Sequence, residues 1–278
     1  MYFYFDGKYY PEGTAILGAN NRGLRYGDGL FETCCIRKGK IQWADEHFSR
    51  LWKGMQVMHF DIPKLLTPDS LEAAVMALVA KNKQVGDIRV RITVLRGDGG
   101  LFDPVDQLPH CLIQSWALPE NHGAWNSNGL VLGIYSDAVK SCDILSNLKH
   151  NNYLPYVMAA LEAKKQKWND AILLNSFGRV CDSAIANIFL IKDKEIITPA
   201  LTEGPVAGIM RKQLLQALPA LHYNISERPV SLEELENADE VFITNAMHPI
   251  RWIQRIGEKE YQSQVTREIY AAFYPTIC

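Results

Sequence analysis

Residues 146–156 read SNLKHNNYLPY and lead into a segment with helical periodicity. The apolar positions at i, i+3, i+4 and i+7 are Leu154, Val157, Met158 and Leu161. With Pro155 in the first turn, this pattern predicts a helix over residues 153–167. Lys149 stands just ahead of that helix among small polar residues, which suit a functional loop better than a core. The stretch makes Lys149 a candidate for chemistry, although a lone lysine is ordinarily a solvated surface charge.

Short strands and further helices are predicted on both sides of this stretch. Asp6-Gly7 is a hairpin turn, and Lys38-Gly39-Lys40 joins two extended runs. Helical patterns cover residues 45–58 and 71–79, and GIMRKQLLQAL (208–218) is expected to be a helix entered through Gly204-Pro205. The predicted strands are IRVRITVLR (88–96), LVLGIYS (130–136), AILLN (171–175), RVCDSA (179–184), NIFLI (187–191), EIITP (195–199) and EVFITNA (240–246).

Turn-forming residues concentrate in ALPENHGAWNSN, residues 117–128, which is poor in aliphatic side chains. We therefore predict two domains, residues 1–118 and 129–278, with a linker over residues 119–128. Lys149 then falls in the C-terminal domain.

Composition excludes several classes of function. The net charge of -2 comes from 29 basic and 31 acidic residues mixed along the chain, so neither nucleic acid nor an anionic membrane is an expected partner. No leader-like start and no apolar run of about 20 residues is present, which predicts a cytoplasmic protein. The six cysteines lack CxxC spacing and are predicted to be reduced thiols, with no metal site. GDGLFE and RGDGG lack nucleotide-binding patterns, and a small molecule is the expected partner.

Six segments together resemble the class IV (fold type IV) pyridoxal-phosphate enzymes, namely branched-chain aminotransferases, D-amino acid aminotransferases and aminodeoxychorismate lyases. They occur in the family's order over nearly the whole chain: RYGDGLFET (25–33), HFSRL (47–51), LKHNNYL (148–154), GRVCDSAIANIFLI (178–191), AGIMR (207–211) and EVFITNA (240–246). The resemblance implies a two-domain α+β or α/β fold of the D-amino acid aminotransferase type. It also implies a homodimer, which no exposed apolar helix face in the sequence announces.

The same resemblance assigns cofactor contacts. Lys149 would hold pyridoxal 5'-phosphate as a Schiff base and act as the general acid-base. Arg50 would bind the phosphate, for which a guanidinium fork is suited; the alternative is a helix-surface arginine near acidic neighbours. Tyr153 matches a tyrosine beside the cofactor's phenolic oxygen, or else packs at the helix start. Backbone amides at Ile209 and Met210, after Gly208, would hold the phosphate at a helix N-terminus.

Two positions depart from the family's pattern. Asp182 stands where the family has a glutamate bonded to the pyridine nitrogen. Its side chain is one methylene shorter, so either the strand comes closer or a water bridges the gap; a carboxylate that caps a turn is the alternative. Ala246 replaces a threonine or serine that contacts the phosphate in many relatives, and Thr244 or Asn245 would compensate.

Substrate contacts are predicted from the N-terminal half. Tyr26 and Phe31 match aromatic residues of the family's substrate pocket, with core packing as the alternative. Arg91 matches a pocket arginine of branched-chain enzymes and is the best candidate for binding a carboxylate, with a structural salt bridge as the alternative. Arg25 could add a second carboxylate contact.

Three functions follow from these matches. The first is an aminotransferase that moves an amino group between an amino acid and a 2-oxo acid. The second is aminodeoxychorismate lyase, which RGDGG and ITNAMHPI favour, but Leu101 stands where lyases commonly have an arginine. The third is a cofactor-binding protein without turnover. The 96–104 loop has no histidine, unlike the carboxylate trap of many D-amino acid enzymes, and the aminotransferase is favoured.

Overall fold

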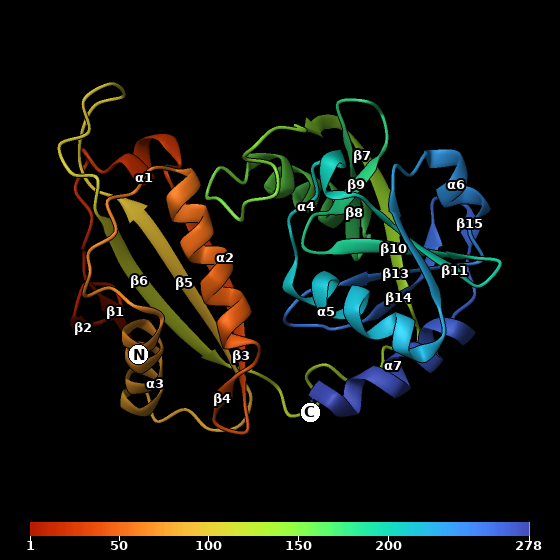
Figure 1. Ribbon diagram of the computed structural model, residues 1–278, viewed down its shortest axis with the longest axis horizontal. Coiled ribbons are helices and arrows are strands. Elements are labelled where there is room, and N and C mark those ends of the chain that lie inside the picture. The colour runs from red at the N-terminus through yellow and green to blue at the C-terminus, as the bar shows by residue number, and fades with distance from the viewer. Residues whose placement is uncertain (278) are drawn as a thin grey trace. The chain divides into compact units, whose positions relative to one another are not determined.

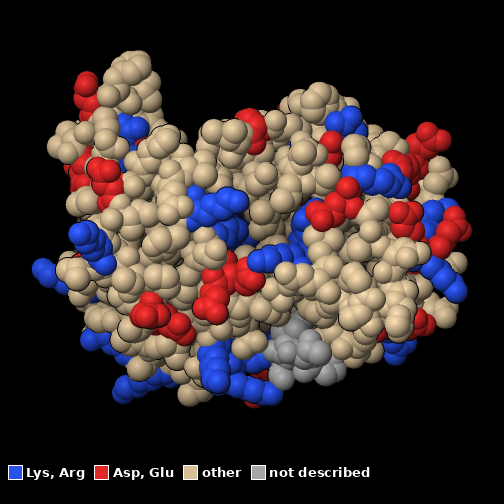
Figure 2. Space-filling view, in the orientation of Figure 1, with Lys and Arg blue, Asp and Glu red and all other residues tan. Residues whose placement is uncertain are grey.

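The computed structural model describes residues 1–277, so Cys278 lies outside the described residues. The chain forms two compact units, each treated by itself below. Unit 1 comprises Met1–His122 and Leu148–Tyr153, and unit 2 comprises Gly123–Asn147 and the chain from Leu154 onward. The five cysteines of the described part are free thiols. On the face drawn in Figure 2, basic and acidic side chains are interspersed.

Unit 1 is built on an antiparallel sheet with the strand order β2-β1-β6-β5-β3-β4 (Figure 1). Its strands are β1 (Tyr2–Phe5), β2 (Lys8–Pro11), β3 (Gly29–Arg37), β4 (Lys40–Ile41), β5 (Ile88–Arg96) and β6 (Pro109–Ala117). Both predicted turns join neighbouring strands, because Asp6, Gly7, Lys38 and Gly39 all adopt positive φ. The β6 strand, not predicted from the sequence, pairs with β5 along its whole length.

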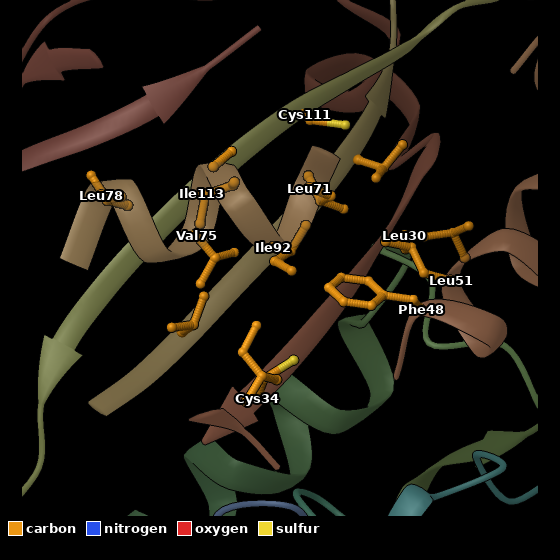
Figure 3. Packing of buried hydrophobic residues seen from close by; sticks show 14 of the residues in the cluster. Leu30, Cys34, Phe48, Leu51, Leu71, Val75, Leu78, Ile92, Cys111 and Ile113 are labelled. Carbon is orange, nitrogen blue, oxygen red and sulfur yellow. The ribbon is translucent and has the colours of Figure 1, made fainter. Parts of the chain in front are cut away.

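Three helices accompany this sheet: α1 (Arg22–Tyr26), α2 (Ala44–Val57) and α3 (Pro68–Lys81). A capping box between Thr67 and Ser70 starts α3, which removes two unsatisfied backbone donors. The unit's core forms where α2 and α3 place apolar side chains on the sheet (Figure 3). There Phe48 and Leu51 of α2 lie near Leu30 of β3, while Val75 of α3 lies near Ile92 of β5.

The segment 148–153 is part of unit 1, which differs from the domain boundaries predicted from the sequence. Its residues 149–151 pair with the start of β3, so the backbone of Lys149 is held by the N-terminal sheet. The chain between the units divides after His122, inside the predicted linker. The linker's later residues pack on unit 2, where Trp125 stacks on Trp252 and Tyr270 donates a hydrogen bond to the Gly123 carbonyl.

Unit 2 contains a nine-stranded sheet with the order β12-β11-β10-β13-β14-β7-β8-β9, and β15 pairs with β14. Its strands are β7 (Leu130–Lys140), β8 (Asp170–Asn175), β9 (Val180–Ser183), β10 (Asn187–Lys192), β11 (Glu195–Pro199), β12 (Asn224–Arg228), β13 (Glu240–Thr244), β14 (Arg251–Ile256) and β15 (Lys259–Glu260). The last strand of this path returns to the third, because Asp182 of β9 pairs with Asn187 of β10. This pairing closes six strands into a ring and brings two polar side chains together inside the unit.

The helices of unit 2 are α4 (Leu154–Gln166), α5 (Ile209–Ala217), α6 (Leu232–Asn237) and α7 (Gln264–Ile277), with 3₁₀ turns at Leu201–Glu203 and Leu218–Leu221. The helix expected at 208–218 is present as α5, but it begins after its N-cap Gly208, and Gly204 ends the preceding 3₁₀ turn in a left-handed conformation. The statement that no helix face is exposed and apolar is wrong. Four side chains of α4 form such a face and are 41–64% exposed: Leu154, Val157, Met158 and Leu161. Within residues 1–277, no helix combines the length and the hydropathy needed to cross a bilayer.

Candidate active site

The backbone of Lys149 is fixed by two hydrogen bonds to β3. Its carbonyl accepts a bond of 2.8 Å from the Phe31 amide, and the Asn151 amide donates one of 2.8 Å to the Gly29 carbonyl. Leu30 and His150 pair antiparallel between them. A loop residue held in this way has the backbone rigidity of a strand, so the direction of its side chain is set by the sheet.

Two aromatic rings lie around the amine of Lys149, and a guanidinium contacts one of these rings. Lys149 Nζ is 4.3 Å from the centre of the Phe31 ring and 5.5 Å from that of Tyr153. These two rings meet edge to face at 5.2 Å. Arg91 lies on the Phe31 ring too, with its Cζ 3.8 Å from the ring centre and its Nε donating to the Thr93 hydroxyl. Burial and the neighbouring Arg89 lower the pKa of Arg91, which marks a cation partly removed from water.

Arg50 is not a helix-surface arginine paired with its acidic neighbours, the alternative to a phosphate-binding role, because it pairs with Glu32 of β3. Its Nε and Nη2 donate to the two carboxylate oxygens of Glu32 at 2.7 and 2.6 Å, and His47 Nδ1 donates to the same carboxylate at 2.7 Å. Burial by itself would raise the pKa of Glu32, but the charges of Arg50 and His47 hold it at about 2. The guanidinium is thus oriented by a buried, permanently ionised partner.

A small cavity, about the size of one water molecule and partly open to solvent, adjoins this ion pair and the lysine. Phe31, Glu32, Arg50 and Lys149 contribute to its lining. Glu32, Cys34 and His47 also offer ligand atoms within 4.8 Å of one another, a spacing compatible with a metal ion. Arg50 already neutralises this carboxylate, and burial raises the pKa of the Cys34 thiol, so the cluster favours the ion pair over a metal.

Arg25 and Tyr26 lie together on α1. The guanidinium carbon of Arg25 is 5.1 Å from the centre of the Tyr26 ring, and that of Arg22 is 5.5 Å from it. Arg25 also reaches the Gly99 carbonyl at 3.4 Å. Arg25 thus contacts Tyr26 and the 97–100 turn. Phe31, by contrast, contacts both Lys149 and Arg91.

Asp182 in unit 2 is 2% exposed and accepts three hydrogen bonds of 2.9 Å. The Tyr156 hydroxyl and the Val206 amide donate to Oδ2, and Asn187 Nδ2 donates to Oδ1. Burial raises the pKa of Asp182 to about 6, although the charge of Lys140 and these bonds act in the opposite direction. The alternative, a strand-end carboxylate that caps a turn, stays open, because one of the three donors is the backbone amide of Val206.

The N-terminus of α5 has the features of an anion site. Its N-cap is Gly208, and no side chain caps the helix there, so Ile209 and Met210 present first-turn amides. A Cβ at Gly208 would overlap Asn187 Oδ1, and only glycine fits this approach. Gly208 is thus packed against Asn187, the residue whose side-chain amide donates to Asp182.

The loop after β13 has its polar side chains already in use. The Thr244 hydroxyl donates to the Pro249 carbonyl, and Asn245 Oδ1 accepts from the amides of Met247 and His248. Asn245 Nδ2 donates to the Ile185 carbonyl at 3.2 Å. These bonds shape the turn around Ala246, so compensation for the missing hydroxyl would come from the turn's backbone.

Five residues that surround the predicted site residues of the two units were not identified from the sequence. In unit 1 they are Glu32 and His47, and in unit 2 they are Lys140, Tyr156 and Asn187. Glu32 and His47 stand inside the quoted segments RYGDGLFET and HFSRL, so the signal was present. Tyr156 gave no signal of its own, because an aromatic residue in a helix's first turn is ordinary core material.

A sequence family described as "Amino-transferase class IV" matches residues 29–256. The chain belongs to the class IV aminotransferase family. This class IV chain is 29% identical over 252 residues to "Aminodeoxychorismate lyase" of Vibrio harveyi, which covers 90% of both proteins. It is 29% identical over 272 residues to a "Putative branched-chain-amino-acid aminotransferase" of Methanocaldococcus jannaschii, which covers 97% of the chain and 92% of the relative. The prediction of an enzyme of this family is confirmed.

Solved structures of class IV proteins share the fold. The 4-amino-4-deoxychorismate lyase of Pseudomonas aeruginosa matches with a TM-score of 0.84 at 28% identity, over 98% of each chain. A branched-chain aminotransferase of Thermoproteus uzoniensis matches with a TM-score of 0.88 at 23% identity, over 100% of this chain and 94% of that one. The predicted α+β fold of type IV is confirmed by these matches.

Proposed function

We propose that this chain is a pyridoxal-phosphate-dependent aminotransferase acting on an amino acid and a 2-oxo acid. The observation that carries the proposal is the shared contact of Lys149 and Arg91 with Phe31. A substrate carboxylate bound by Arg91 would place the substrate's α-carbon within reach of the Lys149 amine. An amine beside a carboxylate-binding guanidinium is the arrangement that amino-acid chemistry requires.

The residues of each unit fit the cofactor by their chemistry. Unit 2 supplies a buried carboxylate at Asp182 for a ring nitrogen and an uncapped helix N-terminus at Ile209 and Met210 for a phosphate. Unit 1 supplies the amine of Lys149, the guanidinium of Arg50 and the phenol of Tyr153. Pyridoxal phosphate, when bound, withdraws electrons from the substrate's α-carbon so that a proton can leave it.

Each residue then has a defined task. Lys149 Nζ takes the proton from the α-carbon and later returns one, and the ladder bonds to β3 keep this amine in place. Glu32 orients Arg50, whose charge favours the phosphate. Arg91 binds the substrate's carboxylate, and Phe31 and Tyr153 exclude water around the amine. Arg25 and Tyr26 are assigned to the far end of the substrate.

The lyase is the second candidate, since two of the relatives above carry that name. Leu101, where lyases commonly have an arginine, argues for amino transfer; the side chain is 59% exposed. The homodimer and the cytoplasmic location stay predictions. The exposed apolar face of α4 is where a test of self-association would begin.

Purified protein supplied with pyridoxal phosphate should develop a visible absorption band, and Lys149→Ala should lack it. Single amino acids are then added in the absence of an acceptor. Loss of the band with release of a 2-oxo acid supports the aminotransferase, whereas release of pyruvate and 4-aminobenzoate from aminodeoxychorismate alone supports the lyase. A band that no substrate alters indicates a binder without turnover. A colourless protein that ignores the cofactor refutes the proposal.

A further inference from the structure

Asp182 is surrounded by hydrogen-bond donors that come from separate parts of unit 2. Tyr156 lies in the first turn of α4, Asn187 starts β10, and Val206 precedes α5. Each donates to the carboxylate at 2.9 Å. Asn187 Nδ2 also donates to the Val206 carbonyl at 2.8 Å, which fixes the orientation of its amide. The carboxylate therefore has one orientation.

The donors leave one acceptor position unused. An ionised carboxylate has about four in-plane lone-pair sites, two on each oxygen. Tyr156 and Val206 use Oδ2 twice, and Asn187 uses Oδ1 once. The remaining site is on Oδ1, where a single N–H donor fits.

A buried cation stands behind this arrangement. Lys140 is 5% exposed, and its Nζ lies 4.6 Å from the centre of the Tyr156 ring. The same Nζ reaches the Ser146 carbonyl at 3.4 Å. A cation beside a phenol strengthens the phenol as a donor, and its charge also favours the ionised form of Asp182.

We propose that Tyr156 and Lys140 are positioning residues that present Oδ1 of Asp182, as a carboxylate, to the ring nitrogen of the cofactor. This inference rests on the proposed function. It favours direct contact over a bridging water for the short side chain, because the donors hold the carboxylate in one place with the unused site on Oδ1. Tyr156 contacts Asp182 and acts through it.

The test measures how well the cofactor-free protein distinguishes two probes. One is pyridoxal phosphate, and the other is its analogue in which C–H replaces the ring nitrogen. The change in the ratio of their dissociation constants between variant and parent reports the ring-nitrogen contact, because the intrinsic differences between the two probes cancel. The unmodified protein should prefer pyridoxal phosphate, and Tyr156→Phe should reduce that preference about tenfold while affinity for the analogue stays constant.

Tyr261→Phe is the matched control. The Tyr261 hydroxyl is also buried in unit 2 and donates to the Leu235 carbonyl at 3.0 Å, without contact to Asp182. Its loss should lower stability and leave the ratio unchanged. If Tyr156→Phe weakens both probes equally, or neither, Tyr156 is structural and the inference is overturned. Equal binding of both probes by the unmodified protein overturns it too.

Lys140 gives a second route if Tyr156→Phe does not fold. Lys140→Met should reduce the ratio, and Lys140→Arg should restore it, because only the charge is needed. Failure of the arginine to restore the ratio contradicts the role of Lys140. Failure of the proposed function is a separate result, in which the unmodified protein binds neither probe and stays colourless.

Discussion

The guanidinium carbon of Arg91 lies 3.8 Å from the centre of the Phe31 ring, on the aromatic side chain that also contacts the Lys149 amine at 4.3 Å. The face of an aromatic ring attracts cations, so the Phe31 ring contacts both side chains. The ring thus links the two groups that we propose bind the substrate and move its proton.

Phe31→Leu should raise the KM for the amino donor about fivefold, because each cation–π contact contributes about 1 kcal/mol. The swap removes three carbon atoms from a buried side chain, so the free energy of unfolding should fall by about 2 kcal/mol. Steady-state kinetics and urea titration measure the two quantities. Phe60→Leu is the control, since Arg96 lies 4.1 Å from that ring in the same unit. It should change stability and leave KM alone; an equal effect on KM would show that the ring has no special role.

Glu32→Gln should lower the free energy of unfolding by about 3–5 kcal/mol, because it leaves Arg50 buried without its counter-charge. The pH dependence has a definite sign. The pKa of Glu32 is lowered from 4.5 to about 2 on folding. Its contribution is therefore complete above pH 4.5 and is lost as the pH falls towards 2. Urea titrations at pH 7 and pH 3 measure this, and a difference between variant and parent that does not shrink at pH 3 would contradict it.

His110 should stabilise unit 1 only while it is protonated. Its Nδ1 donates to Asp6 at 2.6 Å and its Nε2 to Asp106 at 2.7 Å, and these bonds outweigh burial and raise its pKa from 6.5 to about 9. The contribution is complete below pH 6.5 and disappears as the pH rises through 9. Solvent screening limits it to about 1 kcal/mol. Thermal unfolding of the parent and Asp106→Asn should differ at pH 6.5 and converge above pH 9.5; a constant difference would argue against it.

Gly208→Ala should weaken cofactor binding more than tenfold, because the new Cβ overlaps Asn187 Oδ1 and shifts the amides at the start of α5. Equilibrium binding of pyridoxal phosphate to the cofactor-free protein measures the effect. Gly18→Ala is the matched change, since no atom lies within 4 Å of a Cβ there. Unaltered affinity in Gly208→Ala would remove the α5 amides from the phosphate site.

Features encoded within a few residues could be predicted from the sequence. The helical pattern at 71–79 is an example, because it lies within α3, whose start is stabilised inside one turn by Thr67 and Ser70. The helix at 154–166 was predicted too, but periodicity gives only a helix's apolar side, not what covers it. The four apolar side chains of α4 therefore looked like core and are exposed.

Contacts between side chains that are far apart in the sequence could not be predicted. Glu32 and Arg50 are both in quoted segments, but nothing local says that a carboxylate on β3 will meet a guanidinium on α2. Likewise Asp182 is a candidate by its place in a motif, whereas its contact with Tyr156 depends on the meeting of α4 and β9. The packing of segments that are distant in sequence determines such pairs. The periodicity of one segment does not tell which other segment it will contact.

The pairing of residues 149–151 with β3 also has a consequence for the order in which parts of the chain can fold. During synthesis the first 122 residues can form their sheet early, but the added strand reaches β3 only after most of unit 2's opening segment has been made. Closing so long a loop slows folding more than it affects final stability. The amine of Lys149, proposed above to move the substrate's proton, is therefore expected to reach its place late, when the rest of the sheet can already exist.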